Sequence, residues 1–171
     1  RGTAWVAKAD DPAAIYHNPA GLARQRGTTL LVNANILFHS YEFRRLGVFP
    51  DDSKDPATPW GGRPFPVVTN TAPPFAAPFL ALATDFHTFD RLTFAVGVFG
   101  PPAIGNRTFP IGVAGAPAAS RYDSIQSRSL LVYPSAAAAV RVTPWLDLGA
   151  TGHLVYGNFD QTTISFADAA Q

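Results

Sequence analysis

Residues 10–22 read Asp-Asp-Pro-Ala-Ala-Ile-Tyr-His-Asn-Pro-Ala-Gly-Leu, and this stretch contains two helix starts in succession. Asp11 precedes Pro12, and Asn18 precedes Pro19. Asp and Asn side chains accept hydrogen bonds from the free N–H groups of a first helical turn, and proline suits the first helical position. Because the residue before a proline avoids the α region, the first helix cannot continue into the second. The stretch therefore predicts two short helices and excludes one long helix.

After residue 27, apolar residues recur at every second position, which is typical of β-strands. In the first predicted strand, 28–43, the even positions from Leu30 to Phe38 are apolar, whereas Asn33 lies on the other face. The same alternation predicts strands at 79–84, 92–100, 127–142 and 146–159, and the start of another at 162–166. Such two-faced strands fit a barrel wall with its apolar face toward lipid, and also a soluble sandwich with that face inward.

The connections between these strands differ in length. Short turns lie at 85–91 and 143–145, and long connections rich in proline and glycine lie at 44–78 and 101–126. Prolines exclude regular strand pairing over most of the first long connection. Short turns at one end and long loops at the other are typical of outer-membrane barrels. Three aromatic residues near the short turns predict a girdle at a membrane interface, although hairpin packing also explains them: Phe86, Phe89 and Trp145.

The composition excludes several classes of protein. The chain has no cysteine, so disulfides, thiolate metal sites and cysteine nucleophiles are absent. Its net charge of +1 and scattered basic residues argue against nucleic-acid binding. The sequence contains no run of about 18 apolar residues, so it predicts no transmembrane helix. Yet 47% of the residues are hydrophobic and 15% are charged, below the roughly 25% usual for soluble domains.

Residues 9–23, with Asn-Pro-Ala-Gly at 18–21, resemble the hatch of the FadL/TodX family, outer-membrane transporters of long-chain fatty acids and other hydrophobic compounds. The order of strand, long loop, hairpin, long loop and hairpin is also similar to that family over almost the whole chain. The resemblance implies an all-β fold, an antiparallel transmembrane β-barrel with a short N-terminal helical hatch. Residues 1–27 are then the hatch, and 28–171 hold about five of the family's roughly fourteen strands.

Five strands cannot close a membrane barrel, since the smallest have about eight. Open strand edges in lipid leave unpaired backbone groups that cost several kcal/mol each. We therefore expect the chain to be the N-terminal piece of a longer barrel, lacking most C-terminal strands and some residues before Arg1. The isolated piece is not expected to insert into bilayers as a closed unit.

The resemblance implies two sites in the wall and the hatch. The first is a gate, for which local helix capping is an alternative explanation, and it comprises Asp10, Asp11, Asn18, Pro19, Ala20 and Gly21. The second is a kink in the third strand through which a ligand leaves sideways, for which a simple loop start is the alternative, and it comprises Gly100, Pro101 and Pro102. Proline would remove the strand-pairing bonds there.

An apolar path with few polar anchors is typical of ligand sites. Six apolar residues are expected to line it: Ile15, Leu22, Leu31, Leu37, Phe99 and Val155. Either Arg141 or Arg128 could pair with a carboxylate through two parallel bonds, although surface or interface roles also account for both. The four histidines lack metal-ligand spacing, and neither a G-x-S-x-G elbow nor a Walker loop is present, so we expect no metal, no cofactor and no enzyme activity.

The resemblance thus implies passive transport of long-chain fatty acids or aromatic hydrocarbons across the bacterial outer membrane. The expected partners are this hydrophobic small-molecule ligand and outer-membrane lipid, with no nucleic acid, and the full-length barrel is expected to be monomeric. Two alternatives remain: a structural or adhesive outer-membrane barrel without transport, and a soluble all-β binding module. Detergent dependence separates the second alternative from the barrels, and uptake of oleate or toluene separates transport from the first.

Overall fold

The computed structural model describes residues 8–50, 59–101 and 105–165. They form mostly antiparallel β-sheet with few helices, so the all-β expectation is confirmed. The chain divides into two compact units. The first, the hatch unit, contains residues 8–36, 76–101 and 130–157; the second, the loop unit, contains the remaining described residues. None of the helices formed by the described residues has the length and apolar character needed to cross a bilayer.

The N-terminal segment forms the α-helix α2 (Ala14–His17) and the 3₁₀ helix η2 (Pro19–Arg24), which confirms two short helices. Asp11 caps the first turn, since its Oδ1 accepts a 2.8 Å hydrogen bond from the Ala13 N–H. Asn18 separates the helices with an extended backbone (φ −159°, ψ 86°). The predicted cap by the Asn18 side chain is wrong, because this side chain makes no capping hydrogen bond. Instead, the Asn18 carbonyl accepts a 3.0 Å hydrogen bond from the Gly21 N–H in the tighter 3₁₀ turn.

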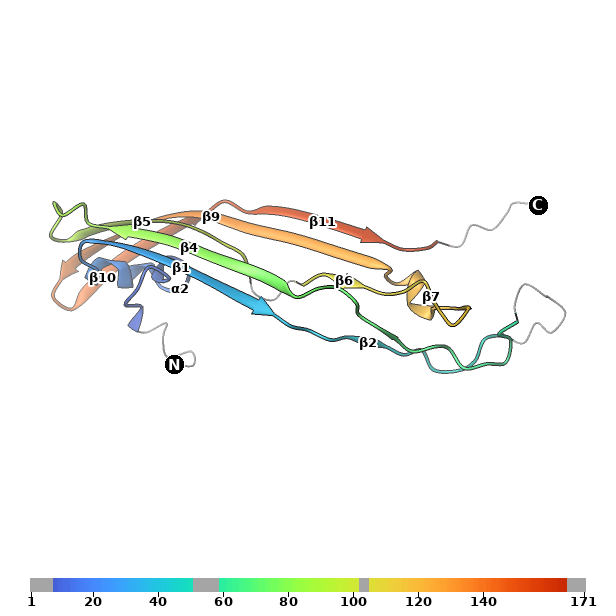
Figure 1. Cartoon of the computed structure of the whole chain (residues 1–171). Coiled ribbons are helices and arrows are strands. Elements are labelled where there is room, and N and C mark those ends of the chain that lie inside the picture. Colours follow the sequence, from blue (N-terminus) through green and yellow to red (C-terminus); the bar gives the residue numbers. More distant parts are fainter. Residues whose placement is uncertain (1–7, 51–58, 102–104, 166–171) are drawn as a thin grey trace. The chain divides into compact units, whose positions relative to one another are not determined.

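The sheet of the hatch unit has the strand order β1-β4-β5-β9-β10 (Figure 1). The strands are β1 (Thr28–Leu37), β4 (Phe75–Thr84), β5 (Leu92–Phe99), β9 (Gln126–Thr143) and β10 (Leu146–His153). β4 to β10 pair antiparallel with their neighbours in this order. Both predicted hairpins are therefore confirmed.

The two faces of this sheet differ in side-chain size and in exposure. One face is buried and carries mainly small residues: Ala81, Ala83, Thr93, Ala95, Ser135, Ala137 and Ala139. The other carries exposed bulky apolar residues: Leu30, Val32, Leu80, Val96, Val98, Leu130, Val140, Val142 and Leu148. Because alternate residues point to opposite faces, one strand supplies both sets. The hatch covers the small-residue face, beside β10 in Figure 1.

Three predicted strand boundaries are wrong. β1 ends at Leu37 and not at residue 43, because the following chain pairs elsewhere, as β2 (Glu42–Phe43) with β3 (Val68–Thr69). β4 begins at Phe75 and includes Pro78, where the prolines of the connection predicted no pairing. The strand predicted at 146–159 is interrupted after His153 and resumes as β11 (Tyr156–Thr162). Of the further strand start predicted at 162–166, Thr162 belongs to β11, residues 163–165 are not in a strand, and Phe166 lies outside the described residues.

Pro134 of β9 explains the interruption between β10 and β11. The last partner of β10 is Ser135, opposite His153, and the Leu154 N–H then donates to the Pro134 carbonyl at 2.9 Å. In an antiparallel pair the N–H and the carbonyl of one residue both face the same partner strand. Proline has no N–H to return, so the regular ladder stops at this pair.

The loop unit contains short elements within the two long connections. β2 pairs with β3, β6 (Arg107–Thr108) pairs with β9, and β7 (Gly112–Val113) pairs with β8 (Ala116–Pro117). The 3₁₀ helix η3 (Ala119–Tyr122) follows, and β11 also pairs with β9. Val68, Phe109 and Ala118 form a small buried cluster of this unit.

Candidate functional site

Residues 8–27, for which we keep the label hatch, pack directly on the small-residue face of the five-stranded sheet, which we call the wall. Ile15 and Leu22 of the hatch have no exposed surface. Gly149 of β10 lies against the backbone of η2, since a Cβ added there would be 2.4 Å from the Pro19 carbonyl carbon and 2.5 Å from the Ala20 nitrogen. Small wall residues therefore permit the helices to approach the strands closely, which explains the size difference between the faces.

Polar contacts join the hatch to the wall at two levels. The Thr151 hydroxyl of β10 donates to the Ile15 carbonyl at 2.9 Å. At the end of η2, Arg24 forms an ion pair with Asp147 of β10, whose side chain is only 10% exposed. Arg141 of β9 approaches the same carboxylate, with 3.5 Å between its Nε and Asp147 Oδ1. We call Arg24, Asp147 and Arg141 the latch.

The latch also includes a backbone contact, because Arg141 donates to the Ala23 carbonyl of the hatch at 3.3 Å. Sequence reasoning considered Arg141 as a partner for a ligand carboxylate and missed its pairing with Asp147 and the pairing of Asp147 with Arg24. Contacts between residues more than a hundred positions apart leave no signal in a single sequence, apart from the inward positions of opposite charges on neighbouring strands.

An aromatic cluster lies on the same face around Phe99, which is 2% exposed. Its ring stacks on Phe79 at 4.8 Å between centroids and meets Tyr16 of the hatch edge-on at 5.0 Å. His153 lies 5.9 Å away and shares a 2.7 Å hydrogen bond with the Ser135 hydroxyl. An apolar cluster with one polar pair is the composition typical of small-molecule sites.

The pairing of β5 with both neighbours ends at this cluster. Phe99 pairs with Phe79 of β4 and with Tyr133 of β9. The next contact is a single long bond of 3.4 Å from the Gly100 N–H to the Pro78 carbonyl. Pro78 cannot return a bond, so the β4–β5 ladder stops where sequence reasoning placed the kink, with Pro78 as the contributor that it missed. Pro101 follows outside the strand, and Pro102 lies outside the described residues.

Some of the predicted gate residues make contacts within the hatch, and two meet β10. Asp11 caps a turn, and Asp10 pairs with Lys8 at 2.8 Å between Nζ and Oδ2. Pro19 and Ala20 supply the backbone that touches Gly149, and a Cβ added at Gly21 would be 2.5 Å from Ala9. The bonds described above that tie the hatch to the wall come from Thr151 and the latch.

The structure brings together three of the six predicted lining residues. Ile15, Leu22 and Phe99 belong to one buried cluster, in which the hatch packs against the sheet. Leu31 and Leu37 on β1 are half-buried outside that cluster, and Val155 is exposed at the interruption between β10 and β11.

The turn between β4 and β5 is fixed by Asp85. Its carboxylate accepts hydrogen bonds from the Gly27 N–H at 3.0 Å and the His87 N–H at 2.8 Å. These two bonds hold the pKa of Asp85 below its usual value of 3.8. Phe86 and Phe89 pack around Phe94 at this turn, with centroids 5.9 and 6.1 Å from its ring. Their role as a membrane girdle stays a prediction.

Within 8–50, 59–101 and 105–165, no three His, Asp or Glu side chains are grouped closely enough to hold a metal ion. Compared with protein-family models, curated proteins and solved structures, the chain matches none.

Proposed function

We propose that this chain forms the hatch and the first wall strands of an outer-membrane β-barrel that passes hydrophobic small molecules without energy coupling. One observation carries the proposal: the sheet exposes its bulky apolar face and buries its small-residue face under the hatch. Val32 is 67% exposed, Val96 55% and Leu148 53%. Contiguous apolar surface of this kind marks an interface with lipid or with protein.

Two features favour a conduit over a purely structural barrel. The Thr151 bond and the latch are polar contacts that join the hatch to the wall, and their loss would help to release it. The β5 ladder ends beside the aromatic cluster at Phe99, which would give a hydrophobic ligand a sideways exit toward lipid. Long-chain fatty acids or aromatic hydrocarbons are the ligands we propose, with no cofactor and no enzymatic step.

The test uses the intact protein in a bacterial host that lacks uptake of these compounds. Membrane fractionation should place the protein in the outer membrane, and radiolabelled oleate or toluene should enter cells faster than in the empty host. A water-soluble protein in the fractionation would contradict the barrel. An outer-membrane protein that gives no uptake of either compound would support the structural or adhesive alternative instead.

A further inference from the structure

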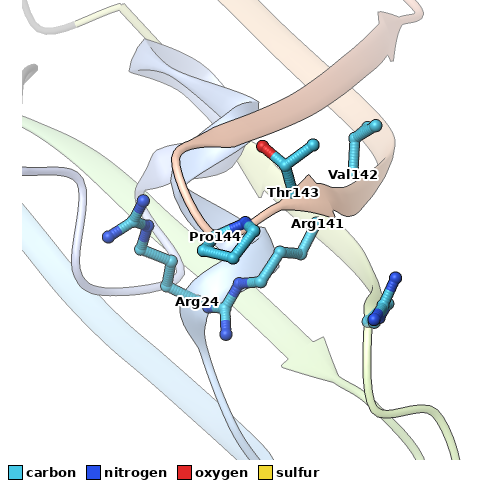
Figure 2. Close-up of a pocket in the computed structure, with 6 residues that line it drawn as sticks. Arg24, Arg141, Val142, Thr143 and Pro144 are labelled. Carbon is cyan, nitrogen blue, oxygen red and sulfur yellow. The ribbon is translucent and has the colours of Figure 1, made fainter.

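We infer that a pocket beside the latch binds a small oxyanion, and that the bound anion competes with Asp147 for the latch arginines. The pocket has a volume of about 420 Å³ and is lined by Arg24, Arg91, Arg141, Val142, Thr143 and Pro144. Figure 2 shows Arg24 and Arg141 close to Pro144, at the turn that joins β9 to β10.

The strand register sets two of these arginines opposite each other. The Arg141 N–H donates to the Arg91 carbonyl at 2.8 Å, immediately beyond the pair of Leu92 and Val140. Like charges directly opposite each other on two strands destabilise a sheet, and an anion between two guanidinium groups would offset their repulsion. This arrangement therefore favours a bound anion.

The charges around the pocket are unbalanced. Asp147 faces two of the three arginines, Arg24 and Arg141. Within the part of the chain that the structure describes, the Arg91 side chain has no ion-pair partner. Arg24 and Arg141 thus share one carboxylate, and Arg91 adds a third positive charge, so the pocket lining together with Asp147 carries more positive than negative charge. Guanidinium groups bind carboxylates and phosphates through paired N–H donors, so an oxyanion is the ligand class that fits.

The same geometry links the anion to the hatch. Arg24 is the last residue of η2 in the hatch, and Arg141 of β9 donates to the Ala23 carbonyl of the hatch. Both arginines also pair with Asp147 of β10, so they join the hatch to the wall. An anion that draws these two groups toward itself weakens their hold on Asp147. Anion binding stands independently of transport, whereas its consequence for hatch release rests on the proposed function.

The test measures binding to the intact protein in detergent by calorimetry, with sodium phosphate and sodium butyrate against sodium chloride at equal ionic strength. The wild type should bind phosphate, butyrate or both, and Arg91→Gln should weaken binding at least about tenfold. Arg63→Gln removes an equal charge from an exposed position outside the pocket and should bind as the wild type does. Butyrate alone would assign the site to carboxylates, and phosphate alone to phosphates.

Absence of binding in the wild type, or equal binding by Arg91→Gln, would overturn the anion site. Competition predicts the opposite effect for a second variant. Asp147→Asn should bind the anion several-fold more tightly than the wild type, because it removes the carboxylate that competes for Arg24 and Arg141. Unchanged or weaker binding by a folded Asp147→Asn variant would overturn the competition. Uptake of toluene, a neutral compound, reports on the proposed function separately, since it needs no anion site.

Discussion

Pro134 and Leu154 form a half-bonded pair: the Leu154 N–H donates to the Pro134 carbonyl at 2.9 Å, but Pro134 has no N–H to donate to the Leu154 carbonyl. Pro78 and Gly100 form a second such pair, with 3.4 Å between the Gly100 nitrogen and the Pro78 oxygen. Both lie at the level of the aromatic cluster around Phe99, since Phe99 pairs with Phe79 and Tyr133, the neighbours of the two prolines. Proline thus interrupts two ladders at one level of the sheet.

The first prediction concerns Pro134. Pro134→Val supplies the missing N–H, which should extend the β9–β10 ladder through Leu154 toward β11. One added hydrogen bond is expected to stabilise the protein by about 0.5–1.5 kcal/mol. Hydrogen exchange should slow at Leu154 and Val155. Ala136→Val, on the same face of β9, enlarges the side chain without adding a backbone N–H, so it should leave the exchange at Leu154 and Val155 unchanged. Equal slowing in both variants would contradict the explanation.

The close approach of the hatch to β10 gives a second prediction. Gly149→Ala places a Cβ 2.4–2.6 Å from the backbone of Pro19 and Ala20, which cannot yield as a flexible side chain would. Overpacking of this kind typically costs about 1–3 kcal/mol. We expect lower thermal stability and faster proteolysis within the hatch. Gly152→Ala is the matched control, because a Cβ there meets nothing within 4 Å. Similar losses in both variants would show that the approach is unimportant.

The alternation of residues along β5, β9 and β10 was sufficient to predict which side chains share a face, because each strand obeys the two-residue period independently. The period cannot show which inward residues meet the hatch. Arg24 and Asp147 pair across most of the chain, and Pro78 lies within β4, where it ends the β4–β5 ladder without preventing the strand. Local rules predicted the strands, whereas their ends depended on partners in the neighbouring strand.

The third prediction is a pH dependence that Asp85 causes. Hydrogen bonds from Gly27 and His87 lower its pKa in the folded state below the usual 3.8. Its contribution to stability should therefore be complete above pH 3.8 and disappear as the pH falls through the lower folded pKa. Unfolding of wild type and Asp85→Asn should differ most near neutral pH and converge in acid. Asp90→Asn, in the same turn, is the control, and a constant gap between wild type and Asp85→Asn down to the lowest pH would contradict this assignment.

The fourth prediction separates lipid from water as the environment of the exposed apolar face. Val96 is 55% exposed on the central strand β5. A surface substitution in a soluble protein usually changes stability by less than about 0.5 kcal/mol. On a lipid-facing strand, Val96→Arg should cost roughly 2–4 kcal/mol near the bilayer centre, because the guanidinium must leave water. Unfolding of the intact protein in bilayers measures this difference.

Leu46→Arg provides the control for Val96→Arg, since Leu46 is 86% exposed in the connection after β2 and should tolerate the charge. Stability that falls for Val96→Arg alone would place the β5 face in a medium that excludes charge. If both variants match the wild type, this face meets water, and the barrel proposal fails with it. A protein partner covering the face would also reject the arginine, but the protein would then remain soluble without detergent, which distinguishes that case from insertion in lipid.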